Sequence, residues 1–329
     1  MENGHSRFIY YLDQLSKLLT QSKKFEDPAL WLFKNKARTA FFMLEGLAII
    51  YGGIQDQKVF DKLKDQFKLI EDGLGAIDHY SALSGIFEDN KQIEKEYKQY
   101  IKKSITQKSE QLNEILIEKD WLSDSGKRIQ KITKNLEEIE WLSPKEEAEA
   151  FCKFYLESID SINKFAIESE FHFDDIEEDV HELRRKIRWL SIYPQAMQGV
   201  FQFATDIETA PHLQKYMTEE ILTSPFNQLP PKGENTTSIL LNKNNFLALS
   251  WVISKLGNLK DEGLVLMGLS EAIKESIVCT KDQALTKALT VLGEKQRNLE
   301  DILEEAEKIT EVFFGEEVLE HLIAGTTSE

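Results

Sequence analysis

The chain has 329 residues, of which 41% are hydrophobic and 29% are charged, a composition typical of a folded globular protein. Its formal net charge of −17 argues against general binding to nucleic acids or anionic membranes, because both require a broadly basic surface. Residues 262–329 hold 15 acidic against 6 basic residues, so a basic pocket elsewhere in the chain is compatible with this charge.

Cysteine usage and the absence of targeting patterns predict a cytoplasmic protein. Cys152 and Cys279 are far apart and form no CxxC pattern, which is typical of reduced structural thiols. The first residues lack the basic-then-apolar layout of a secretory signal. No apolar run approaches the roughly 20 residues that a membrane span requires. We therefore expect no membrane association.

Long segments rich in Leu, Ile, Glu and Lys, separated by few glycines and prolines, predict an all-α fold. Before residue 174, helices are expected over residues 6–21, 29–51, 56–80, 90–118, 127–142 and 144–169. A further helix begins after Asp175 and is kinked or broken at Pro194. The last helices are expected over residues 244–259, 262–278 and 284–323, the last of them interrupted near Gly293 and Gly315. Residues 223–242 predict a long loop, and no segment predicts a β-ladder.

Specific residues mark several helix ends. Pro28 opens the second helix and Gly52-Gly53 is expected to end it. Ser143 and Glu146 predict a capping box at the start of the helix over residues 144–169.

Residues 174–199 carry the most distinctive pattern of charges. On a helical wheel, Arg184, Arg185 and Arg188 fall within about 60° of His181, as one basic stripe. The opposite face is apolar and is expected to pack into a core; it carries Val180, Leu183, Ile187 and Leu190. Guanidinium groups are good anion receptors, because they offer a planar fork of donors that stays charged. The stripe therefore predicts an anion site or, as the simpler interpretation, a solvated basic face paired with acids.

A weak internal repeat divides the chain near residue 142. The apolar series Phe67, Ile70, Leu74-Gly75 and Ile77 recurs as Leu249, Val252, Leu256-Gly257 and Leu259. Each copy follows a helix that bears basic residues. We expect two antiparallel helical bundles, residues 1–142 and 143–329, related by approximate internal two-fold symmetry. Chance similarity between Leu-rich helices is the alternative.

The repeat and the basic stripe resemble the CHAD family, the conserved histidine α-helical domain. His181, Arg184 and Arg188 match the H-x-x-R-x-x-x-R signature, and the two Leu-Gly pairs resemble the L-G-x-x-R-D segment of that family. The resemblance covers roughly residues 30–270. It implies two helical bundles with a basic cavity between them that binds inorganic polyphosphate. Arg38 and Lys34 are then the expected counterparts of the stripe in the first half.

We expect a non-catalytic binding module for inorganic polyphosphate or another phosphorylated polyanion, without a cofactor. The expected anion-binding residues are His181, Arg184, Arg185, Arg188, Lys34 and Arg38. Phosphate would draw His181 toward its protonated form, so binding is expected to strengthen at mildly acid pH.

Two other functions stay open. A helical scaffold with a degraded anion site is the first, because Trp189 and Ser191 occupy positions where the family signature has further basic residues. A metal-carboxylate enzyme is the second, suggested by Glu178-x-x-His181, although the chain shows no second Glu-x-x-His. Nucleotide-binding loops and the serine-hydrolase elbow are absent from the sequence.

Overall fold

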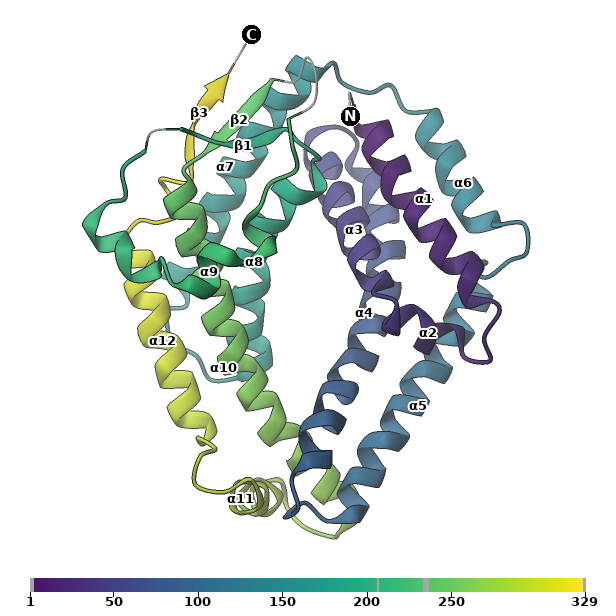
Figure 1. Cartoon of the computed structure of the whole chain (residues 1–329), viewed down its shortest axis with the longest axis vertical. Coiled ribbons are helices and arrows are strands. Elements are labelled where there is room, and N and C mark those ends of the chain that lie inside the picture. Colours follow the sequence, from purple (N-terminus) through teal and green to yellow (C-terminus); the bar gives the residue numbers. More distant parts are fainter. Residues whose placement is uncertain (1–2, 206, 233–236, 328–329) are drawn as a thin grey trace.

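The computed structural model describes residues 3–205, 207–232 and 237–327, and its fold is predominantly all-α, as predicted (Figure 1). The helices of the first half are α1 (Gly4–Ser22), α2 (Pro28–Lys34), α3 (Ala37–Ile54), α4 (Gln57–Asp89), α5 (Lys95–Glu118) and α6 (Lys127–Glu137). The α-helices of the second half are α7 (Pro144–Glu168), α8 (Glu182–Ala196), α9 (Glu219–Thr223), α10 (Lys243–Ser276), α11 (Lys281–Leu292) and α12 (Leu299–Gly315). Shorter helical turns are η1 (Ile176–His181), η2 (Pro211–Tyr216) and η3 (Pro225–Asn227).

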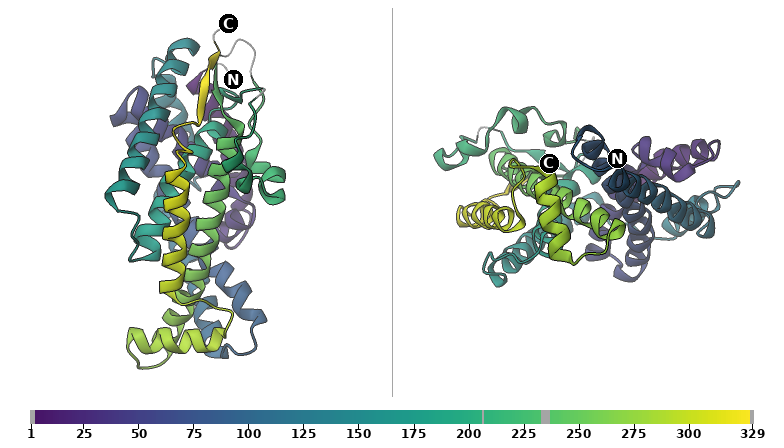
Figure 2. Two further views of the ribbon diagram at one scale, coloured as in Figure 1. Left: turned by 90° about the vertical axis from the view of Figure 1, so that its left-hand side faces the viewer. Right: turned by 90° about the horizontal axis from the view of Figure 1, so that it is seen from below.

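The helices enclose a central opening (Figure 1). Helices α1–α6 form one side of the molecule, and α7–α12 form most of the other (Figure 1). The two sides meet at one end, where α3 packs against α7 and α8, and at the other end, where α5 packs against α10. The side view in Figure 2 shows α11 lying across this second end.

Two hydrophobic clusters hold these ends together. The larger cluster includes residues of both halves, from Phe8 in α1 to Leu322 near the end of the chain. The smaller cluster joins the last turns of α4 and α10, and there Leu83 packs closely on Gly268. A Cβ atom at position 268 would lie 2.4 Å from a methyl carbon of Leu83, so the backbone of α10 approaches α4 because Gly268 has no side chain.

The second predicted helix is in fact two helices. Residues 29–51 were expected to be continuous, but α2 ends at Lys34 and α3 begins at Ala37. Lys36, between them, has a left-handed backbone with φ of 58°. Gly52-Gly53 does not end α3, which continues to Ile54. A Cβ at Gly53 would lie 2.6 Å from the ring of Phe154, so this glycine accommodates a neighbouring aromatic ring instead of ending the helix.

The separate helices expected over 244–259 and 262–278 form one continuous helix, α10, of 34 residues. The glycines inside it again make room for side chains of other elements: Gly257 faces Arg184, and Gly263 faces Ile176. Helix α4, with 33 residues, is likewise longer than the expected 56–80. The predicted capping box at Ser143 and Glu146 is confirmed at the start of α7.

The prediction that the chain forms no β-ladder was wrong. Three short strands, β1 (Phe201–Phe203), β2 (Ser238–Leu241) and β3 (Ile323–Thr327), form a sheet in the order β1-β2-β3. Strand β2 pairs parallel with β1 and antiparallel with β3. Strands of three to five residues are too short to show a clear alternating pattern. Part of the expected loop over 223–242 is therefore a strand, and residues 233–236 of it lie outside the described residues.

Helix α3 is the one described helix that is long and apolar enough to cross a membrane, by length and composition alone. It packs against α1, α4, α7 and α8, and 56% of it is buried inside the protein, as is typical of a core helix. Cys152 and Cys279 are both free thiols.

Candidate anion-binding site

The basic stripe lies on α8 and on the turn that precedes it. Residues Ile176–His181 form a π-helical turn, not the expected start of an α-helix, and such turns are frequent at functional sites. The side chain of Asp175 caps this turn by accepting hydrogen bonds from the backbone N–H groups of Glu177 and Glu178. The predicted apolar face is confirmed as buried: it consists of Val180, Leu183, Ile187 and Leu190. Its burial turns the basic stripe away from this core.

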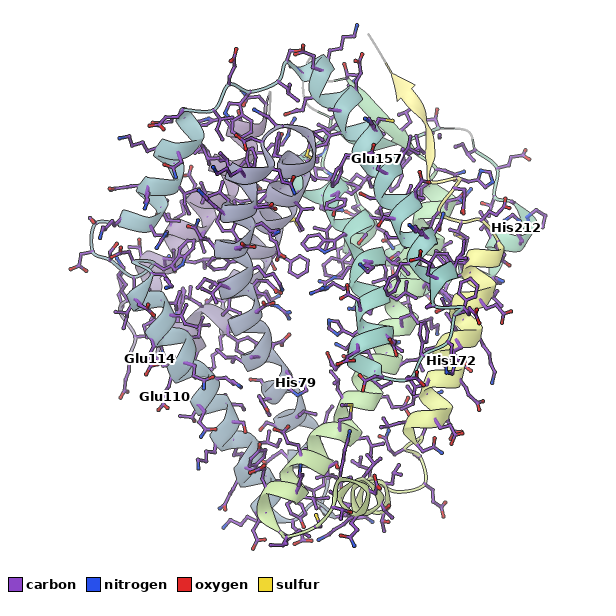
Figure 3. The ribbon with its side chains drawn as sticks, turned by 180° about the vertical axis from the view of Figure 1, so that it is seen from behind. His79, Glu110, Glu114, Glu157, His172 and His212 are labelled. Carbon is purple, nitrogen blue, oxygen red and sulfur yellow. The ribbon has the colours of Figure 1, made fainter. Side chains whose placement is uncertain are left out.

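The stripe lines a large cavity between the two sides of the molecule, with a volume of about 1390 Å³. Five of the six predicted site residues line it: His181, Arg184, Arg185, Arg188 and Arg38. Lys34 does not line it and is exposed in the last turn of α2. Figure 3 shows His79 of α4 beside the central opening, whereas Glu157 and His172 lie on the outside.

Arg38 is held by two carboxylates of α4. Its Nε donates a hydrogen bond to Glu71 at 2.6 Å, and its Nη1 donates to Asp78 at 2.9 Å. Burial raises the pKa of Glu71, although the positive charge of Arg38 acts in the opposite direction. Arg38 therefore has a counter-charge within the protein.

Arg184 and Arg188 form no ion pair of this kind with a described residue, and the negative charges of Asp261 and Glu71 act on them only from farther away. No carboxylate of the described residues lies within 4 Å of either guanidinium. The Nε of Arg184 donates a hydrogen bond to the carbonyl oxygen of Ile253 at 3.0 Å. The guanidinium of Arg188 lies over the ring of Phe42, 4.5 Å from its centroid. Both side chains are partly buried, which leaves two adjacent cations poorly compensated.

The pKa values of these arginines reflect this environment. Burial, together with the charges of Arg184 and Arg38, lowers the pKa of Arg188 to about 10. Burial also lowers the pKa of Arg184. Both groups stay charged at neutral pH, at a cost in free energy that an external anion would reduce.

The two Leu-Gly pairs explain how Arg38 and Arg184 are placed. A Cβ at Gly75 would lie 2.8 Å from Nη2 of Arg38, and a Cβ at Gly257 would lie 2.9 Å from Nε of Arg184. Each glycine thus allows an arginine of a neighbouring helix to lie against its own helix. The repeat found in the sequence thus corresponds to two similar contacts. In one, an arginine of α3 lies against a glycine of α4, and in the other, an arginine of α8 lies against a glycine of α10.

His181 is neutral at pH 7 in the free protein. Burial, followed by the charges of Lys260 and Arg184, lowers its pKa to about 4. Its Nδ1 is buried without a hydrogen-bond partner, 3.6 Å from a carboxylate oxygen of Glu177. Arg185 is paired with Glu182 at 2.7 Å and is half-exposed, so it contributes less free positive charge than Arg184 or Arg188.

Further charged residues of the large cavity were missed by sequence reasoning. Among the described residues, eight Lys or Arg and eight Asp or Glu line it, so the formal charges of this lining balance. Lys64, Lys68 and Glu71 belong to α4 and are spaced by four and three residues, which places them on one face of the helix; this spacing was the signal in the sequence that could have identified them. Glu45 of α3 also faces the cavity, and burial together with the nearby charge of Glu71 raises its pKa to about 7.

Nothing in the described part of the chain forms a group of three or more His, Cys, Asp or Glu side chains that could hold a metal ion. No protein-family model matches the chain, and no curated protein is recognisably similar to it.

Proposed function

We propose that the protein is a non-catalytic binding module for a phosphorylated anion, as a divergent relative of the CHAD family. Arg184 and Arg188 are the central ligands, and Arg38 and His181 lie beside them. The observation that supports this function is the pair of partly buried guanidiniums without a carboxylate partner among the described residues. Inorganic polyphosphate is the ligand that the family resemblance suggests.

Binding of phosphate oxygens to these guanidiniums is charge-assisted and sensitive to salt. Bidentate hydrogen bonds from Arg to phosphate are among the strongest polar contacts in proteins. A ligand of this kind would supply a direct anionic partner for Arg184 and Arg188, which no carboxylate of the described residues provides within 4 Å.

The test measures affinity for long-chain polyphosphate across a salt series, by isothermal titration calorimetry. We expect binding that weakens steeply as salt rises, because each ion pair formed displaces counterions. Arg184→Ala and Arg188→Ala should each weaken binding by at least tenfold. Lys103→Ala is the matched control, because Lys103 is exposed on α5 and does not line the large cavity. Undetectable binding of any phosphate compound at low salt would contradict the function.

A scaffold function is the second candidate. It is favoured by the pairing of Arg38 with Glu71 and Asp78, and of Arg185 with Glu182, which leaves two of the predicted site cations already neutralised. Protein partners of the wild-type chain would then be retained by the Arg184→Ala/Arg188→Ala double variant. Loss of the same partners from that variant would exclude the scaffold function.

A further inference from the structure

A second, smaller pocket lies against the same arginines. Its volume is about 470 Å³, within the range usual for sites that bind small molecules. Arg38, Phe42, Arg184 and Arg188 line both this pocket and the large cavity, and so stand between the two. Helix α9 and the turn η3 supply one wall of the small pocket, and α9 packs beside α10 (Figure 1).

The charge of the small pocket differs sharply from that of the large cavity. Three arginines line the small pocket, and Glu220 is the one carboxylate among the described residues that line it. The large cavity, in contrast, carries eight acidic residues against eight basic ones. An anion that reaches Arg184 and Arg188 therefore meets less repulsion in the small pocket.

The polar residues of the small pocket suit a phosphoryl group. Hydroxyl groups are supplied by Thr39, Ser191, Ser224, Ser250 and Ser254. The hydroxyl of Ser254 donates to Glu220 at 3.3 Å, a long hydrogen bond that a ligand could replace. Serine and threonine hydroxyls complement arginine at phosphate sites, because they donate to oxygens that the guanidinium forks leave free.

The remaining wall is apolar. It is formed by Phe42, Met43, Ile192, Ile221, Phe226 and Ile253. The segment that carries Ile221 and Phe226 is tied to α8, because the side-chain amide of Gln195 donates to the carbonyl oxygens of Phe226 and Gln228. A free inorganic phosphate would leave this apolar wall without a partner.

We propose that the ligand binds in the small pocket and is a small organic phosphate, with its phosphoryl group at Arg184 and Arg188 and its carbon part against the apolar wall. This inference rests on the proposed function and names the class of ligand for the same arginines. A long inorganic polymer fits this pocket less well, because a polymer needs a continuous positive track and has no carbon part to bury.

The test compares three probes, phenyl phosphate, inorganic phosphate and long-chain polyphosphate, by isothermal titration calorimetry on the full chain. Phenyl phosphate should bind at least tenfold more tightly than inorganic phosphate. Ser250→Phe fills the small pocket, whereas Ala76→Phe is the matched substitution in the large cavity. Ser250→Phe should weaken binding of phenyl phosphate by at least tenfold, and Ala76→Phe by less than twofold. Ser254→Leu provides a second block of the small pocket should Ser250→Phe fail to fold.

Equal affinity for phenyl phosphate and inorganic phosphate would overturn the inference, as would an equal or greater loss in Ala76→Phe. Tight binding of polyphosphate with no binding of phenyl phosphate would overturn it while leaving the proposed function intact. Absence of binding for all three probes would contradict the proposed function itself.

Discussion

Arg184 lies so close to Gly257 that a Cβ atom at position 257 would be 2.9 Å from its Nε and 3.0 Å from its Nη2. The same relationship joins Arg38 to Gly75, at 2.8 Å. The two glycines thus set the positions of two arginines that belong to other helices. This relationship leads to the first prediction.

Gly257→Ala should displace the guanidinium of Arg184 and weaken phosphate binding by about fivefold or more, which corresponds to about 1 kcal/mol. The fold should persist, because an arginine side chain can move and alanine favours helix. Calorimetric titration with the phosphate probe measures the loss. Gly85→Ala is the control: Gly85 also lies inside a helix, but a Cβ there meets nothing within 4 Å. Unchanged affinity in Gly257→Ala would show that the position of Arg184 does not matter for binding.

Arg188→Met should stabilise the protein while removing phosphate binding. Methionine keeps much of the side-chain volume over Phe42 and removes a poorly compensated positive charge, so the free energy of unfolding should rise by about 0.5–2 kcal/mol. Urea unfolding measures this change. Lys103→Met, on the exposed face of α5, should stay within about 0.5 kcal/mol of wild type. A less stable Arg188→Met protein would indicate that Arg188 serves the fold.

Between pH 8 and pH 6, the affinity for phosphate should rise about fivefold more in wild type than in Glu45→Gln, a difference of about 1 kcal/mol, because Glu45 loses its negative charge in this range. The comparison cancels the protonation of the phosphate group itself, whose second pKa is about 6. The sign follows from the pKa of Glu45, which is about 7: Glu45 is mostly ionised at pH 8 and mostly protonated at pH 6. Titrations at both pH values should show this additional dependence in wild type and in His181→Asn, since the pKa of His181 is about 4. Glu45→Gln should lose it. If this additional pH dependence of phosphate binding were lost in His181→Asn and kept in Glu45→Gln, it would arise from His181, as the sequence predicted.

Arg7→Met should destabilise the fold strongly. Arg7 is 1% exposed, and its Nη1 donates hydrogen bonds to Glu147 at 2.6 Å and to Tyr51 at 2.7 Å. Its Nε donates to the carbonyl oxygen of Met197 at 3.0 Å, so one side chain connects α1, α3, α7 and the end of α8. Removing it leaves the buried Glu147 carboxylate without a cation, at a cost of about 3–5 kcal/mol.

Urea unfolding again provides the measurement for Arg7→Met. Lys153→Met breaks an exposed ion pair with Glu157 on α7 and should cost less than about 0.5 kcal/mol. A loss below about 1 kcal/mol in Arg7→Met would contradict the importance of this buried network.

The helical fold and the apolar faces could be predicted from the sequence, because burial repeats with the helical period. The apolar series of α4 (Phe67, Ile70, Leu74 and Ile77) and the apolar face of α8 are both buried, as predicted on this basis. Helix ends at glycines were predicted in part: the breaks expected near Gly293 and Gly315 are confirmed, because α11 ends at Leu292 and α12 at Gly315, but the end expected at Gly52-Gly53 was wrong. Gly53 lies inside α3, and Gly257 and Gly263 lie in α10 on either side of the break that was expected between residues 259 and 262; each makes room for a side chain from another element. A single sequence shows that a glycine is present, but not which neighbour needs the space.

The site was predicted in part. The stripe on α8 was visible because its residues are adjacent in one helix, and four of its members do line the large cavity. Lys34 was added by analogy and lies outside it. The carboxylates that neutralise Arg38 come from α4, and the small pocket depends on α9, so neither could be read from the stripe. Which arginine is paired with a carboxylate depends on contacts between segments that are far apart in the sequence.

The close packing of Leu83 on Gly268 has a mechanical consequence. Helices α4 and α10 are each over 30 residues long and meet there, beyond the arginines, while their other ends are fixed in the larger core. The distance between α4 and α10 along the large cavity therefore depends on the contact between Leu83 and Gly268. A bulkier residue at position 268 would push α4 and α10 apart. It would widen the large cavity without replacing any of the arginines that line it.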